Sequence, residues 1–187
     1  MAESSMPLRA CRARFLAGNL AARRVAGGLR AGYPQAMTRW PIPQPMQDAL
    51  AHARLAAASG EVPVGAVVTL GGKVIAAAHN APRQDHDPTA HAEIVAIRAA
   101  ASALGRERLE SCDLWVTLEP CAMCAGAISH ARIARLYYAA SDPKGGAVEQ
   151  GARVFDQPQC LHRPEVYAGI GADSAAELLR GFFAARR

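Results

Sequence analysis

Four residues that could bind a metal or carry protons stand in two short segments of this sequence. His91 and Glu93 lie two positions apart in TAHAEIVAI, and Cys121 and Cys124 lie three positions apart in EPCAMC. One imidazole and two thiolates are three ligands of the kind that zinc takes in proteins. A tetrahedral ion then keeps one position for water, which is the ligand count of a catalytic zinc site rather than of a closed structural one.

The spacing of each pair predicts how the side chains lie. Cys121 and Cys124 are i, i+3 at the start of a predicted helix, so both sulfurs lie on one side of its first turn. The exposed N–H groups and the positive end of the helix dipole there favour thiolates. His91 and Glu93 are about 200° apart on a helix, so they diverge. We expect His91 to reach the ion from the helix start while the longer Glu93 folds back toward the bound water. Two thiolates cancel the charge of Zn²⁺, so this water needs a nearby base.

Each residue has a simpler interpretation when it is taken alone. A single C-x-x-C is as often a redox motif as a metal site. A histidine at a helix start is usually a solvent-facing or capping residue, and a glutamate there is favoured by the dipole. The joint pattern H-x-E followed by P-C-x-x-C, with both parts at predicted helix starts, matches the signature of zinc-dependent deaminases. The combination therefore favours a catalytic zinc site.

The helices and strands that would position these residues can be predicted for the chain from residue 46 onward. Asp87 is the expected cap and Pro88 the expected first residue of the helix that carries His91, and Gly105 ends it. The pair Gly71-Gly72 predicts a two-residue hairpin. Helices are expected over 46–60, 87–104, 119–131 and 174–187, and strands over 62–70, 73–80, 113–118, 133–140 and 164–170, the last at a sheet edge. Strands that alternate with helices predict an α/β fold with helices on both faces of a sheet.

Composition predicts one domain built on small aliphatic side chains. The chain has 187 residues, of which 51% are hydrophobic and only 5% aromatic, so the core must consist mainly of Ala, Val, Ile and Leu. No apolar run approaches the roughly 20 residues that span a bilayer. The net charge is +5 in total and +6 within residues 1–40, so the rest of the chain carries −1. Net charge therefore does not indicate a nucleic-acid partner, and any basic surface on the domain must be local.

Residues 1–45 differ from the rest, being rich in Arg and Ala and ending in WPIPQP. We expect a disordered N-terminal extension there, possible translation starts being Met37 and Met46. A transit peptide and a nucleic-acid-binding arm are the two alternatives. Five cysteines, of which only two are close in sequence, are not a disulfide framework and fit a reducing compartment, the cytoplasm.

Four segments, EVPVGAVV, DPTAHAEI, VTLEPCAMCAGA and FFAARR, resemble the bacterial tRNA-specific adenosine deaminases (TadA family). The likeness covers residues 46–187, which would form the deaminase domain. The resemblance implies a three-layer α/β/α cytidine-deaminase-like fold with a five-stranded mixed sheet, and a homodimer with one Zn²⁺ per subunit. It also implies that the wobble adenosine of a tRNA anticodon, in an arginine tRNA with anticodon ACG, is deaminated to inosine.

The matching motifs assign roles residue by residue. The resemblance implies that His91, Cys121 and Cys124 hold zinc and that Glu93 carries protons. The residues that would bind substrate are Asn80, Val62, Pro63, Asp142, Phe183, Arg186 and Arg187. Asn80 would hold the flipped base, Val62 and Pro63 would form the pocket wall, and the others would contact RNA. After Lys144 the chain departs from the enterobacterial pattern, in a region that lies near the RNA in the family.

Simpler roles exist for several of these residues. Asn80 also fits an ordinary turn, one of Phe182 and Phe183 must pack the last helix, and terminal arginines also fit a solvated helix end. Two rival functions stay open. The first is a deaminase of a free base such as guanine or cytosine, which shares the zinc constellation. The second is a zinc-stabilised RNA-binding module without catalysis.

Overall fold

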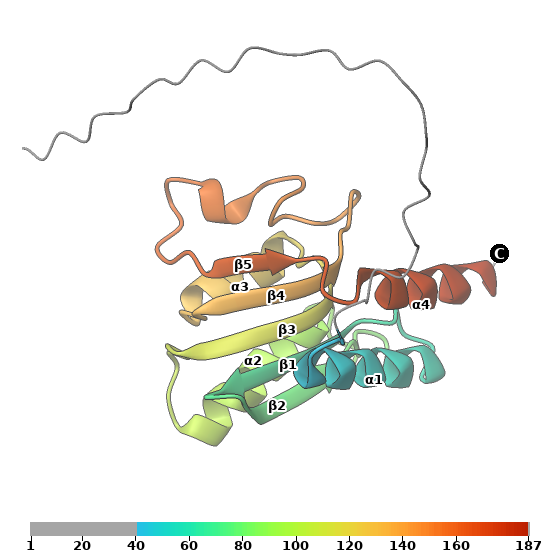
Figure 1. Cartoon of the computed structure of the whole chain (residues 1–187), viewed down its shortest axis with the longest axis horizontal. Coiled ribbons are helices and arrows are strands. Elements are labelled where there is room, and N and C mark those ends of the chain that lie inside the picture. Colours follow the sequence, from blue (N-terminus) through green and yellow to red (C-terminus); the bar gives the residue numbers. More distant parts are fainter. Residues whose placement is uncertain (1–40, 187) are drawn as a thin grey trace, which may run out of the picture. The chain divides into compact units, whose positions relative to one another are not determined.

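The computed structural model describes residues 41–186, in which helices flank a central sheet (Figure 1). In chain order the elements are α1 (Gln44–Ala58), β1 (Gly65–Leu70), β2 (Lys73–His79), α2 (Ala92–Leu104), β3 (Cys112–Leu118), α3 (Ala122–His130), β4 (Arg135–Ala140), the 3-10 helix η1 (Val154–Asp156), β5 (Glu165–Ala168) and α4 (Ala172–Ala184). The helices and strands predicted from the sequence are all present, with their ends shifted by a few residues.

The five strands form one mixed sheet in the order β2-β1-β3-β4-β5. β1 pairs antiparallel with β2 and with β3, whereas β3 with β4 and β4 with β5 are parallel pairs. Gly71 and Gly72 join β1 to β2 with φ of +57° and +79°, the left-handed pair that a two-residue hairpin requires. The parallel pairing of β3 with β4 needs a crossover, which α3 provides.

Helices cover both faces of this sheet, as the alternation of elements predicts. On one face, Ile97 of α2 and Ile128 of α3 belong to the same core cluster as Leu114 of β3. On the other face, Met46 of α1 clusters with Trp115, the next residue of β3, and with residues of α4. Successive residues of a strand point to opposite faces, so β3 contributes to both layers. The predicted α/β/α fold with a five-stranded mixed sheet is confirmed.

The helix α1 lies very close to β1 at Gly65. A Cβ at this position would overlap the carbonyl oxygen of Ala49 and lie 2.6 Å from the backbone nitrogen of Ala53. The Gly65 N–H donates to the hydroxyl of Thr117 at 3.1 Å. An Ala-rich helix and a glycine therefore bring two backbones together, which fits the predicted core of small aliphatic residues.

The start of α2 differs from the prediction. The expected cap Asp87 and first helical residue Pro88 both precede the helix, which begins at Ala92. Asp87 Oδ1 instead accepts hydrogen bonds from the N–H and the hydroxyl of Thr89, each at 2.7 Å. An aspartate bonded to the backbone two residues ahead stabilises a turn rather than a helix start. As a result, His91 takes the N-cap position of α2.

Other helix ends agree with the sequence to different degrees. α1 begins at Gln44 because its prolines fall in the first turn, where no N–H is needed. Gly105 ends α2 in the left-handed conformation, with φ +61°, as predicted. α4 ends at Ala184, so Arg186 follows the helix instead of lying in its last turn, and that expectation is wrong. The Arg186 N–H bonds to the Phe183 carbonyl at 3.3 Å, which tightens the chain just past the helix.

The predictions for residues 1–40 lie outside the described residues. Ile42, which was assigned to the N-terminal extension, packs against the core cluster that contains α1 and α4. None of the helices described in residues 41–186 has the length and apolar character needed to cross a membrane. The four cysteines of this part of the chain are free thiols.

Candidate active site

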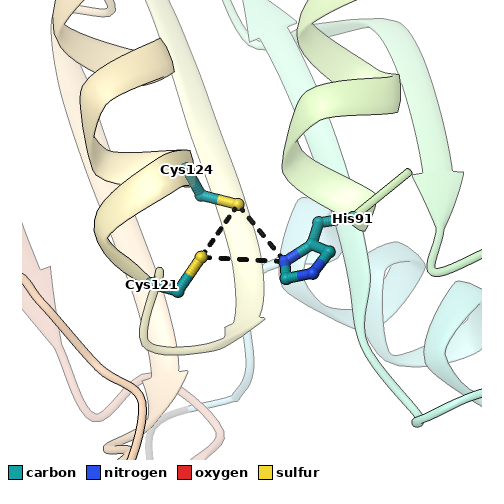
Figure 2. A group of neighbouring side chains, drawn as sticks. All are labelled: His91, Cys121 and Cys124. Carbon is teal, nitrogen blue, oxygen red and sulfur yellow. Dashed lines mark hydrogen bonds between the residues drawn. The ribbon is translucent and has the colours of Figure 1, made fainter. Parts of the chain in front are cut away.

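His91 stands at the N-cap of α2, outside the helix proper. Its backbone is extended, with φ −71° and ψ 149°. The rotation of about 200° that a regular helix would place between the side chains of His91 and Glu93 therefore does not apply. Asn80 Oδ1 accepts the Ala92 N–H at 2.9 Å and thereby satisfies one of the N–H groups that a helix start leaves unpaired. Because Asn80 makes this capping hydrogen bond, the His91 side chain does not cap the helix. Its imidazole instead faces α3 (Figure 2).

The two cysteines occupy the start of α3. Cys121 is its N-cap residue, with an extended backbone at φ −72° and ψ 174°. Cys124 lies in the first turn and is fully buried. The predicted spacing is confirmed, because the two sulfurs lie 3.6 Å apart.

The imidazole and the two thiols converge from two helix starts (Figure 2). His91 Nδ1 lies 3.7 Å from Cys121 Sγ and 3.5 Å from Cys124 Sγ. Tetrahedral zinc, with Zn–S of about 2.3 Å and Zn–N of about 2.0–2.1 Å, sets its ligand atoms about 3.5–3.8 Å apart. Residues 41–186 contain this one group of His, Cys and acidic side chains with the geometry of a metal site. The three residues form a zinc-binding triad, which confirms the predicted ligands.

Hydrogen bonds within the triad favour a thiolate at Cys121. The hydrogen bond with Cys124, and then the one with His91, lower the pKa of Cys121 to about 3. The bond to Cys121 in turn raises the pKa of His91. The pKa of Cys124 is raised by its bond with Cys121 and by burial. Zinc binds neutral imidazole and thiolate, so protons that compete for these ligand atoms are released when zinc binds.

Glu93, the second residue of α2, is buried beside the triad. Its side chain is only 4% exposed, and this burial raises its pKa because a carboxylate is costly to remove from water. The positive charge of His91 acts on the same carboxyl and lowers the pKa in part. A carboxyl group with a raised pKa is suited to take up and release protons near neutral pH. This environment is the one that the predicted proton-carrying role requires.

A groove of about 990 Å³ holds four of the seven residues predicted to bind substrate. Its lining combines Val62, Asp142, Phe183 and Arg186 with Leu118 at the end of β3. These residues come from distant parts of the chain, and the fold brings them together. The lining does not include the zinc triad, although Cys121 lies only three residues after Leu118 in the sequence.

The other three predicted substrate residues are placed differently. Asn80 and Pro63 are buried and do not appear in the lining of the groove. Asn80 Oδ1 is engaged by the start of α2, as described above. Arg187 lies outside the described residues.

The end of α4 presents one aromatic ring to solvent and packs another. Phe183 is 49% exposed and meets the ring of Phe182 edge to face, at 5.3 Å between centroids. The Arg186 guanidinium lies 3.5 Å from the centroid of Phe182, a cation–π contact that holds it in place. Of the two phenylalanines, one of which was expected to pack the helix, Phe182 is half-buried and Phe183 is exposed.

Several residues at or near the groove were missed by the sequence analysis, and Lys144 and Glu119 are two of them. Lys144 lines the groove beside Asp142, and its position two residues after Asp142 was the only signal. Glu119 is buried at 2% exposure although it is charged. Its signal was an acidic residue that directly follows an apolar strand, where burial is costly unless the carboxylate is hydrogen-bonded.

A zinc triad at two helix starts on an α/β/α fold, with a buried glutamate beside it, defines the class of zinc-dependent nucleobase deaminases. Residues 43–187 match the MafB19-like deaminase family. The tRNA-specific adenosine deaminase of Agrobacterium fabrum (strain C58) is 58% identical over 142 residues, which make up 76% of this chain and 93% of that protein. The chain therefore belongs to the tRNA-specific adenosine deaminase family.

Solved structures agree with this placement. One from a study of A-to-I editing by tRNA:A34 deaminases at the wobble position is 58% identical, with a TM-score of 0.72, and the match covers 72% of this chain and 98% of that one. A guanine deaminase from Nitrosomonas europaea is 26% identical, with a TM-score of 0.62 and coverage of 75% and 83%. The fold is thus shared with deaminases of both an RNA base and a free base.

Proposed function

We propose that this protein hydrolytically deaminates the wobble adenosine, position 34, of a tRNA anticodon to inosine. Arginine tRNA with anticodon ACG is the proposed substrate. The observation that carries the proposal is the zinc-binding triad with Glu93 buried beside it. The tRNA-specific relative at 58% identity supports RNA as the substrate.

In the proposed reaction the protein moves protons and holds the base. Zinc held by His91, Cys121 and Cys124 would acidify a water molecule and present it to C6 of the base. Glu93 takes the proton from this water and donates it to ring N1 as the C6–O bond forms. Glu93 then takes a second proton, from the hydroxyl now on C6, and passes it to the amino group, so that the C6–N bond breaks, ammonia leaves and the C6 carbonyl forms. Adenosine and water thus give inosine and ammonia, and Glu93 ends in its starting state.

Asn80 would hold the flipped base in this scheme. Its Oδ1 accepts the Ala92 N–H, which fixes the orientation of the amide. Within the described residues its Nδ2 has no hydrogen-bond acceptor, so it is available as a donor to a purine nitrogen. Val62 and Pro63 supply the wall of the base pocket in the same proposal.

The groove between Asp142 and α4 is the proposed path of the anticodon loop. An exposed ring such as Phe183 offers a face on which an unpaired base stacks. Arg186 and Arg187, with Lys144, supply positive charge to phosphates. Asp142 would contact the backbone of the flipped nucleotide. Because the chain outside residues 1–40 has a net charge of −1, this local cluster is what would attract RNA.

We further propose a cytoplasmic homodimer in which both subunits contribute to each RNA surface. Free thiols throughout the described chain are compatible with a reducing compartment. A mass of two chains in solution is the expected result of light scattering at micromolar concentration. A mass of one chain at that concentration, in protein that is fully active, would contradict the dimer.

Incubation of the zinc-loaded protein with ACG-anticodon arginine tRNA is expected to produce inosine at position 34. Inosine pairs with cytidine, so sequencing of the copied tRNA reports it as an A-to-G change at that single position. The matched control is the same tRNA with G at position 34, which should remain unchanged. Recovery of unreacted adenosine after long incubation with excess protein would overturn the proposed function.

A second candidate is deamination of a free base, because the Nitrosomonas europaea guanine deaminase shares the fold. Release of ammonia from free guanine, cytosine or adenine separates the two activities. We expect no turnover of these bases, since the exposed Phe183 and the neighbouring Arg186 are features of an RNA groove rather than of a closed base pocket.

A further inference from the structure

Glu119, the residue after β3, is at the centre of an unusual set of hydrogen bonds. Its Oε1 accepts the backbone N–H groups of Val148, Glu149 and Gln150 at 3.2, 2.9 and 2.9 Å. Its Oε2 accepts the hydroxyl of Ser141 at 3.0 Å and the N–H of Asp142 at 3.1 Å. Five donors from one loop, residues 141–150, therefore converge on a single carboxylate that is 2% exposed.

The loop is shaped so that it can close around this carboxylate. A Cβ at Gly146 would lie 2.6 Å from Glu119 Cδ and 2.6 Å from the carbonyl oxygen of Asp142. Only glycine leaves room for the loop at this point. A buried carboxylate is tolerated only when hydrogen bonds replace water, so Glu119 and the loop depend on each other.

The same loop carries two residues that line the groove. Asp142 is held to Glu119 through its N–H, and its own Oδ1 accepts the Lys144 N–H at 3.0 Å. The Asp142 carbonyl accepts the Gly146 N–H at 2.9 Å. The positions of Asp142 and Lys144 along the groove are thus set by a chain of hydrogen bonds that begins at Glu119.

The segment after Glu119 fixes the loop to the zinc site as well. The Ala147 N–H donates to the Pro120 carbonyl at 2.9 Å, and Gly146 forms an isolated antiparallel bridge with Cys121. Residues 119–121 therefore all contact the loop, and the last of them, Cys121, is also a zinc ligand. This links the place where RNA would bind to the place where chemistry would occur.

We propose that Glu119 is a positioning residue for the RNA substrate, because its carboxylate holds loop 141–150 with Asp142 and Lys144 along the groove. The inference rests on the proposed deamination of tRNA, in which those two residues face the anticodon loop. Glu119 acts through the loop and does not touch the reacting atoms. Its removal should therefore affect substrate binding more than the chemical step.

The variant Glu119→Gln tests this role with little change in size. A glutamine oxygen can keep the three N–H groups of residues 148–150, but its NH₂ group then faces the Asp142 N–H, and two donors cannot pair. We expect the KM for tRNA to rise about 5- to 100-fold, the range for one buried donor left without an acceptor, with kcat within about twofold. Glu110→Gln makes the same chemical change at an exposed position and should leave both constants unchanged.

A second variant reaches the same contact from the loop side. Gly146→Ala inserts a Cβ against Glu119 and Asp142 while leaving the carboxylate in place, and it should raise KM in the same way. Hydrogen exchange at the Asp142 amide should be faster in both variants than in the wild type, and zinc content should stay at one per chain.

The outcomes separate this inference from the proposed function. If the wild type edits tRNA and Glu119→Gln keeps its KM and its protected Asp142 amide, the positioning role is wrong. Loss of zinc with an unchanged KM would also overturn it, since Glu119 would then serve the metal site. If the wild type itself does not edit tRNA, the proposed function fails, whatever the variants do.

Discussion

Replacement of Glu93 with glutamine is expected to lower the rate of tRNA deamination by about 10²–10⁴-fold, the usual contribution of a positioned acid–base group. Glutamine fills the same buried space but cannot take a proton from water or return one to the base. His91, Cys121 and Cys124 are untouched, so zinc content and tRNA affinity should not change. Single-turnover deamination, zinc analysis and a binding titration on the same preparation measure the three quantities.

Two controls make the Glu93 result specific. Glu93→Ala should be as inactive as Glu93→Gln, because both lack an ionisable group. Glu110→Gln, at an exposed position, should keep wild-type turnover. The rival idea of a zinc-stabilised RNA-binding module without catalysis predicts no turnover in any of these proteins. Turnover at the wild-type rate in Glu93→Gln would show that another group carries the protons.

Replacement of Cys124 with serine is expected to abolish both zinc binding and turnover. Cys124 is fully buried and supplies one of the three ligand atoms. Loss of a group that merely orients a ligand weakens metal binding about 10–100-fold, so loss of a ligand should exceed that. Zinc that binds only the folded state stabilises it, and the variant should also unfold at a lower temperature than the zinc-loaded wild type.

Cys160→Ser is the matched control for this experiment. Cys160 lies away from the triad and its thiol donates to the carbonyl of His162 at 3.0 Å, a bond that a serine hydroxyl can also make. This variant should keep one zinc per chain and normal turnover. A chelator should bring the wild type to the state of Cys124→Ser, and added zinc should restore only the wild type. Full activity of Cys124→Ser after chelation would contradict a catalytic role for the triad.

The sequence was sufficient for the zinc site because its ligands lie in local patterns. Each of the two segments places its side chains at or near a helix start. The start that carries the cysteines can be recognised from its neighbours, such as Pro120 before Cys121, whereas the start next to His91 could be located only to within a few residues. The pairing of the segments followed from known ligand chemistry. The relation of His91 to Glu93 was explained only in part, because a regular helix through both residues was assumed. The structure resolves the conflict because the helix begins only after His91, at Ala92.

The shift in the start of α2 shows where local rules compete. Asp87 followed by Pro88 is a good helix start, and the same aspartate is also a good turn residue. Asn80 decides between these two roles of Asp87. Its side-chain oxygen accepts the first N–H of the helix, that of Ala92, which lies twelve residues later in the sequence. Such a contact between distant residues leaves no periodic pattern in the sequence, so the local signal was misread.

The surroundings of the groove were less accessible from the sequence for a similar reason. Val62, Asp142 and Phe183 come together only when β1, β4 and α4 have been placed by the sheet order. Glu119 looked like part of the motif around the cysteines, and its five hydrogen bonds depend on the path of loop 141–150. Residue types alone predicted the ligands of the metal, whereas the loop that borders the groove required the fold.

X-ray absorption at the zinc edge of the purified protein tests the central claim most directly. The account predicts one zinc per chain, bound by two sulfur atoms at about 2.3 Å and by two nitrogen or oxygen atoms at about 2.0–2.1 Å. One of the lighter atoms is His91 Nδ1, and the other belongs to an exchangeable solvent molecule that a small anion such as azide can replace. A zinc ion with a third sulfur ligand, or with a fourth position that no added ligand can enter, would contradict the account.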